Sequence, residues 1–130
     1  MNFWQAMNTA VYSTLGSALG SGTPVYYQQA KDNAGVPYVV FNWQSAIDEN
    51  ATPSRMWNTL VNVRSFASYP AQSGSIDALI DGALVGKTIN VTGWTNFWTS
   101  RTLAFSDVET LPNGEKSWVS GGLYRIRIGK

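Results

Sequence analysis

The stretch from Pro37 to Trp43 constrains the fold of this chain more than any other, because nearly every residue in it is apolar, β-branched or aromatic. Such a run between turn-forming residues predicts a strand. Successive side chains of a strand point to opposite faces, so Val39 and Phe41 share one face and their neighbours share the other. Both faces are largely apolar, so both need a cover. We expect helices of the chain to cover one face, and another sheet or another protomer to cover the second.

The composition excludes several kinds of chemistry. The 130 residues include no cysteine and no histidine, which excludes disulfides, thiol catalysis, zinc sites built on Cys or His, and mechanisms with a histidine base. Nine basic and eight acidic residues give a net charge of +1, so there is no strong electrostatic footprint for nucleic acid. Charged residues make up 13% of the chain and aromatic residues another 13%. Aromatic enrichment at the expense of charge is typical of interface cores and favours a component of an assembly.

Two segments have the spacing of amphipathic helices. Apolar residues recur every three or four positions over residues 2–19, with Asn2 as a candidate N-cap and Gly20 at the end. A second apolar stripe begins after Pro70 and ends before Gly86. The residues of this second stripe are Ile76, Leu79, Ile80, Ala83 and Leu84.

Period-two patterns predict the strands. They cover residues 24–28, 37–43, 56–68, 88–94, 97–106 and 118–128. An Asn-Gly pair at 113–114 predicts a hairpin between the last two. The fold expected is a single α+β domain, 1–130, in which two α-helices pack on one face of an antiparallel β-sheet in the order α-β-β-β-α-β-β-β.

Alternation also assigns the faces of the last two strands. We expect Tyr124, Ile126 and Ile128 to face the core. On the strand over 97–106, alternation places Phe97, Leu103 and Phe105 on one face, and Trp98, Thr102 and Ala104 on the other. The pair Gly121-Gly122 predicts a bulge or a close approach of two backbones.

Residues 44–55 have no periodicity and are predicted to form a long loop, of the kind that usually carries function. Ile47 is a lone apolar residue among polar ones there, so we expect an adjacent protomer or partner to bury it. Arg125, Arg127 and Lys130 form a small basic end beside aromatic residues, which is either solvated surface or a contact to nucleic acid backbone. The candidate interface residues are Ile47, Asp48, Glu49, Arg55, Trp98, Arg125 and Arg127.

No pattern of catalytic residues is visible in the sequence. Asp77 and Asp81 lie one turn apart on the second predicted helix, where they either hold a cation together or form a plain polar face. The Gly20-Ser21-Gly22 stretch lacks the lysine and spacing of a phosphate-binding loop. We therefore expect no enzyme activity, no catalytic residue, no cofactor and no metal site. We also expect no membrane span, because no apolar run is long enough.

The order of these elements resembles the tail completion or tail terminator proteins of long-tailed bacteriophages. The resemblance rests on the Asn-Phe-Trp-Gln-Ala start of the first helix and on the two strands after it. It continues through the second helix, which ends near Gly86, to the short sequence motifs Ser100-Arg101-Thr102-Leu103 and Leu123-Tyr124-Arg125-Ile126-Arg127. The resemblance covers nearly the whole chain, as a pattern of secondary-structure elements and short apolar sequence motifs.

This resemblance implies a structural protein of the virion, located at the phage neck and assembled in the host cytoplasm. Such a protein forms a ring, commonly a hexamer, on the head-proximal end of the tail tube, stops tube growth and supports head–tail joining. The implied partners are further copies of the chain, the tail tube protein and the head–tail connector protein, with no membrane and at most non-specific contact with the DNA that passes through the ring.

Two other classes stay open from the sequence. One is a monomeric carbohydrate-binding module, because indole rings stack on sugars and the chain has six Trp residues. Trp43, Trp57 and Trp98 alternate with apolar neighbours, however, which favours a place in the core or in an interface. The other is a small enzyme whose site the sequence does not reveal.

Overall fold

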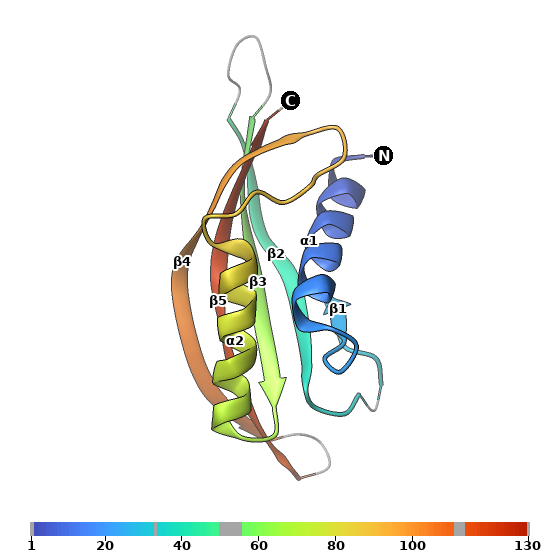
Figure 1. Ribbon diagram of the computed structural model, residues 1–130, viewed down its shortest axis with the longest axis vertical. Helices are drawn as coiled ribbons and strands as arrows, with labels where there is room; N and C mark the ends of the chain where they lie inside the picture. The colour runs from blue at the N-terminus through green and yellow to red at the C-terminus, as the bar shows by residue number, and fades with distance from the viewer. Residues whose placement is uncertain (1, 33, 50–55, 111–113, 130) are drawn as a thin grey trace.

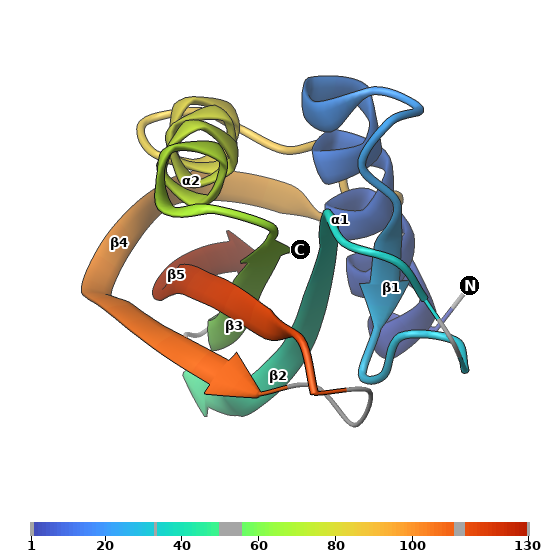
Figure 2. The ribbon, with the colours of Figure 1, turned by 90° about the horizontal axis from the view of Figure 1, so that it is seen from below.

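The computed structural model describes residues 2–32, 34–49, 56–110 and 114–129. Its elements are α1 (Phe3–Leu19), β1 (Val25–Tyr27), β2 (Tyr38–Glu49), β3 (Met56–Ala67), α2 (Pro70–Leu84), β4 (Thr95–Thr110) and β5 (Lys116–Gly129). Both helices lie on the same face of one curved sheet (Figures 1 and 2). The predicted α+β class, with two helices on one face, is therefore confirmed. No helix in the described part of the chain is long and apolar enough to cross a membrane.

The sheet has the strand order β1-β2-β3-β5-β4. β1 is parallel to β2, and every other neighbouring pair is antiparallel. β2 and β5 therefore run in one direction, and β3 and β4 run in the other. β4 forms one edge of the sheet, and the other edge is shared between β1 and the rest of β2.

β1 covers only a short part of the β2 edge. It pairs with Val39–Phe41, and its last bond comes from Gln28, whose N–H donates to the carbonyl of Phe41 at 2.8 Å. The φ of Gln28 is 67°, a left-handed value that turns the chain away from β2. Beyond Phe41, no strand among the described residues pairs with this edge of β2.

The core lies between the helices and the sheet. Phe41 is fully buried there, as predicted, and so are Tyr124, Ile126 and Ile128 of β5. The N-cap of α1 is also as predicted: Asn2 Oδ1 accepts from the Gln5 N–H at 2.9 Å, and Gln5 Oε1 accepts from the Asn2 N–H at 3.2 Å. This reciprocal pair satisfies two N–H groups at the helix start.

The predicted loop over 44–55 is wrong for its first half. Residues up to Glu49 continue β2 and pair with β3, from Ser45 opposite Leu60 to Glu49 opposite Met56. A bulge between Trp43 and Ser45 interrupts the alternation, and the polar side chains that follow belong to an edge strand, where backbone pairing requires no apolar face. Residues 50–55, which include Arg55, lie outside the described residues.

The predicted strand over 88–94 is also wrong, so the sheet formed by the described residues has five strands and not six. Ile89 and Val91 are buried, but they reach the core from a non-strand connection. The Ile89 N–H donates to Asn96 Oδ1 at 2.8 Å, and the Trp94 N–H donates to the Val91 carbonyl at 3.0 Å. The apolar residues alternate here because Ile89 and Val91 are both buried in the core, although the segment pairs with no strand among the described residues.

β4 departs from simple alternation because its register shifts twice, between Asn96 and Trp98 and between Arg101 and Leu103. Trp98 stands opposite Arg127, and Phe105 stands opposite Gly121. Because residues 121 and 127 share a face of β5, Trp98 lies on the same face as Phe105 and not on the opposite one, as alternation predicted.

The second helix also differs from its predicted stripe in one position. Leu79 is exposed, while Ser73 is buried instead. The buried residues Ser73, Ile76, Ile80 and Leu84 follow one narrow line along α2. The other face of the helix points to solvent, so a single row of contacts is enough to hold it on the sheet.

The predicted close approach at Gly121 is confirmed. A Cβ at this position would overlap the backbone carbonyl oxygen of Val63 and meet the ring of Phe105 at 3.0 Å. The bulge itself lies on the facing strand β4. Gly121 therefore allows β3, β5 and the Phe105 ring to pack closely where the sheet curves.

Candidate functional site: the outer face of the sheet

The outer face is the side of the sheet turned away from α1 and α2. One row of facing residues crosses it near the end of β2. Ile47 stands opposite Asn58, Asn58 opposite Arg127, and Arg127 opposite Trp98. Ile47 is 57% exposed and Trp98 is 42% exposed, so the two ends of the row are apolar and open to solvent.

The middle of this region is polar and internally bonded. Arg127 binds the carboxylate of Glu49 through Nε at 2.9 Å and through Nη2 at 2.8 Å. Arg125 donates from Nη1 to Asn58 Oδ1 at 2.7 Å. The structure thus gives three of the predicted interface residues partners within the chain. Asp48 is half-buried, which leaves Ile47 and Trp98 as the most exposed members of the predicted set.

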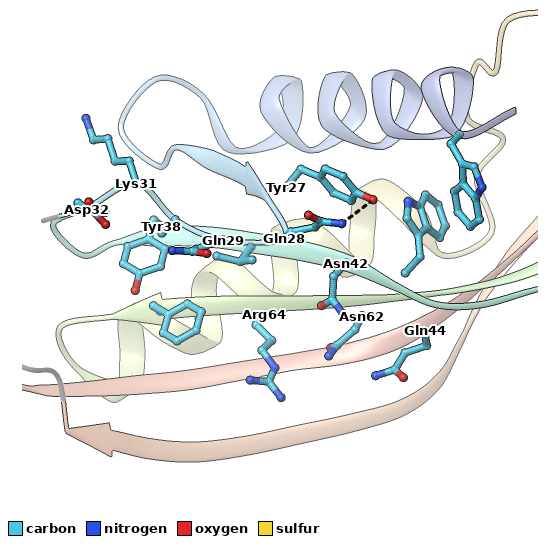
Figure 3. A pocket seen from close by; sticks show the side chains of 16 residues that line it. Tyr27, Gln28, Gln29, Lys31, Asp32, Tyr38, Asn42, Gln44, Asn62 and Arg64 are labelled. Carbon is cyan, nitrogen blue, oxygen red and sulfur yellow. Dashed lines mark hydrogen bonds between the residues drawn. The ribbon is translucent and has the colours of Figure 1, made fainter. Parts of the chain in front are cut away.

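A groove of about 1220 Å³ lies along the outer face of β2 and β3 and under the segment after β1 (Figure 3). Its lining includes Tyr27, Tyr38, Asn42, Asn62, Arg64 and Phe66. The rings of Tyr38 and Phe66 are stacked with centroids 4.8 Å apart. This groove occupies the second face of the strand that runs through residues 38–43, so within the described residues that face is only partly covered.

Two groups in the groove have distinct electrostatic properties. Asn62 is 6% exposed, and its Oδ1 accepts no hydrogen bond from any residue that the structure describes. Such a buried acceptor is costly to leave unpaired. Burial raises the pKa of the Tyr38 phenol above its ordinary value, and the negative charge of Glu109 and the neighbouring Tyr26 add to the rise. Tyr38 therefore stays neutral, and the groove offers hydrogen-bonding groups beside aromatic rings.

An ion cluster joins α2 to β4 on the helical face. Arg101 Nη2 binds Asp77 Oδ1 at 2.8 Å, and Arg101 Nη1 binds Asp81 Oδ1 at 3.3 Å. Arg101 Nη2 also donates to the carbonyl of Gly121 at 2.7 Å. Burial alone would lower the pKa of Arg101, but the hydrogen bond to Asp77, with Tyr124 and the two carboxylates, gives a net rise.

The two aspartates thus hold a cation that belongs to the chain itself. This Arg101 guanidinium is neither a bound metal ion nor a feature of a plain polar face, so the sequence indicated neither partner nor contact. Within the described ranges, no group of three or more His, Cys, Asp or Glu side chains is placed to bind a metal.

Most Trp side chains serve the packing of the fold. Trp43 donates from Nε1 to Asn8 Oδ1 at 2.6 Å, and Trp57 stacks on Phe3 with centroids 4.6 Å apart. Trp94 meets the same Phe3 ring edge-on at 5.6 Å. The sequence predicted a place in the core or in an interface for Trp43 and Trp57, and both are partly buried and pack against the core. Trp4 and Trp98 are the largely exposed pair, on α1 and β4 respectively.

Sequence reasoning missed the groove and the cluster around Arg101. The groove depends on the shortness of β1 and on the left-handed backbone conformation of Gln28. No residue pattern in the sequence predicts either feature. The spacing of Asp77 and Asp81 was a usable signal, but the partner lies on β4, which the α2 sequence does not reveal.

Comparison with known proteins gives one kind of match. No protein-family model matches the chain, and no curated protein matches it. Among solved structures, a chain of the virion of a native gene transfer agent particle superposes with a TM-score of 0.67. The alignment covers 97% of this chain and 96% of that chain, at 16% sequence identity. The two chains share a fold.

Proposed function

We propose that this protein is a structural component of a phage-like virion. The observation that carries the proposal is the end-to-end match of its fold to a chain of a gene transfer agent virion. Because both chains are covered almost completely, the likeness involves the whole architecture and not a common substructure. The independent resemblance of the sequence to phage tail terminator proteins supports the same class of protein.

Within the virion, we propose that the protein forms a ring, commonly of six copies, that caps the head-proximal end of a tail tube and supports head–tail joining. The fold positions an exposed apolar side chain at each end of one outer-face row, where it is available for contacts between copies. The partners of this role are the tail tube protein on one side and the connector protein on the other. The role needs no bound cofactor and no reaction.

The test uses the full chain together with the tail tube protein of the same virion. Size-exclusion chromatography with light scattering should show a ring of the pure protein or of its complex with tubes. Electron microscopy should show that adding the protein during tube assembly stops tube elongation. A chain that remains monomeric and leaves tube length unchanged would refute the proposal. Binding to immobilised oligosaccharides in that case would favour the carbohydrate-binding alternative.

A further inference from the structure

The exposed large apolar side chains concentrate on the edges of the sheet. Of the eleven in the described part of the chain, four are on β4 alone. These four are Phe97, Trp98, Leu103 and Val108. On the opposite edge, Ile47 of β2 is the most exposed of all eleven. Exposed apolar side chains on two separate edges of one sheet allow two different contact surfaces, one at each edge.

The strand registers place the two surfaces at the same height. The row Ile47–Asn58–Arg127–Trp98 joins one edge of the sheet to the other across four strands. Facing residues in adjacent strands point to the same side of a sheet. Ile47 and Trp98 therefore lie on the same face and at the same level. A second copy set beside the first without any shift along the strands brings its Ile47 against Trp98.

The strand directions allow this arrangement to repeat. β4 runs opposite to β2, so β4 of one copy meets β2 of an identically oriented copy in the antiparallel sense. Identically oriented neighbours are related by rotation about an axis roughly parallel to the strands. A contact between two different surfaces, repeated by such a rotation, builds a ring when the rotation closes after a whole number of copies.

The β4 edge limits the form that this contact takes. Its Thr99 carbonyl already accepts the N–H of Gly86 at 3.0 Å, and its two register shifts interrupt a regular ladder. Bulges of this kind blunt an edge for backbone pairing. Side-chain packing must then supply most of the contact. Repulsion between like charges does not oppose the contact at this level, because the β4 residue at the height of Glu49 is Thr95, which is neutral.

We propose that the Trp98 edge of β4 in one copy docks against the Ile47 edge of β2 in the next copy, head to tail around the ring. This inference rests on the proposed ring and specifies the two surfaces that build it. Trp98 supplies the large aromatic anchor that dominates many interfaces, and Ile47 supplies the apolar surface that receives it.

Two single substitutions test the inference, Ile47→Asp and Trp98→Asp. Each places a charge in the contact and should convert the ring to a monomer in light scattering. Leu79→Asp is the matched control, because Leu79 is a similarly exposed apolar residue on α2, away from both edges. It should leave the ring unchanged. Circular dichroism and urea unfolding of each variant establish that the protomer is folded.

The decisive measurement is an equimolar mixture of the two variants. Each variant keeps one intact edge, so the mixture should form a dimer of one Ile47→Asp copy and one Trp98→Asp copy, and nothing larger. A ring that survives either substitution, or a mixture that remains monomeric, overturns the inference while the ring of the wild-type protein stands. A wild-type chain that forms no ring, alone or on tail tubes, refutes the proposed function itself.

Discussion

The guanidinium of Arg127 on β5 spans β3 and binds both carboxylate oxygens of Glu49, the last residue of β2. The pair fastens the end of β2 to a strand two positions away in the sheet. Both side chains are 33% exposed, so solvent screens much of their attraction. The contact should therefore affect local order more than global stability.

We expect Arg127→Met to lower the free energy of unfolding by about 1 kcal/mol or less, as is usual for exposed ion pairs. Amide hydrogen exchange over residues 47–49 should nevertheless become faster, because the strand end loses its attachment. Urea unfolding and exchange mass spectrometry measure the two effects. Lys87→Met, on the exposed connection after α2, serves as the control. Unchanged exchange at the end of β2 would contradict this role for Arg127.

Phe41→Ala should destabilise the protein by about 3–5 kcal/mol, the usual range for deleting a buried phenylalanine. The side chain is fully buried between the sheet and the helices, so its removal leaves a cavity. Val40→Ala, on the half-buried outer face, should cost clearly less. The shift of the urea midpoint gives both values. A loss of less than about 1 kcal/mol for Phe41→Ala would show that the site collapses around the cavity.

Two glycine substitutions should change stability in opposite directions. Gly121→Ala forces a methyl group into the Val63 carbonyl and the Phe105 ring, and overpacking of this kind costs about 1–3 kcal/mol or more. Gly82→Ala sits on the exposed side of α2 with nothing within 4 Å of the added carbon. It should stabilise the protein by about 0.5–1 kcal/mol, because alanine loses less entropy in a helix. Thermal melting of both variants compares them directly. A stable Gly121→Ala protein would refute the close packing at this point.

Stability should fall at alkaline pH because of Tyr124. Burial raises the pKa of this phenol well above its ordinary value of 10.0; Arg101 acts to lower it, while Asp77 and Asp81 raise it further. Above about pH 10 the unfolded chain loses this proton while the folded chain keeps it, so the free energy of unfolding decreases as pH rises. Below about pH 10 the phenol is neutral in both states and has no effect.

Tyr124→Phe tests this assignment. The variant keeps a ring beneath the Arg101 guanidinium, which lies 5.4 Å from the ring centroid, and removes the ionisable hydroxyl. Urea unfolding of both proteins at about pH 8 and about pH 10.5 should show a smaller alkaline loss for the variant. The other tyrosines are common to both proteins and cancel in the comparison. Equal losses would assign the alkaline effect to those other tyrosines.

Strong local patterns predicted the fold class and most of the elements. The alternation of Tyr124, Ile126 and Ile128 identified a buried face, and the capping signal at Asn2 identified the start of α1, because both depend on neighbouring residues alone. The run through Phe41 likewise identified the central strand. These features need no knowledge of the partner element.

The errors occurred where the partner decides the structure. Residues 44–49 form a strand because β3 lies beside them, although their side chains show no alternation. Ile89 and Val91 alternate without being a strand, because no strand in the described part of the chain pairs with them. The faces of β4 depend on two register shifts, and the position of Trp98 follows from the first of these. The candidate site was predicted in part: its exposed ends, Ile47 and Trp98, were named, but their common row was not.

The order of the strands also has a consequence for how the chain reaches this structure. The β2–β3 and β4–β5 pairs each join neighbouring segments, whereas the β3–β5 seam joins Met56 to Gly129 and Ala67 to Trp118, with α2 and β4 lying between them in the chain. Closing such distant contacts has a larger entropic cost than closing local ones. The β2–β3 pair and the β4–β5 pair can therefore each form first. The pairing of β3 with β5 should then limit the folding rate.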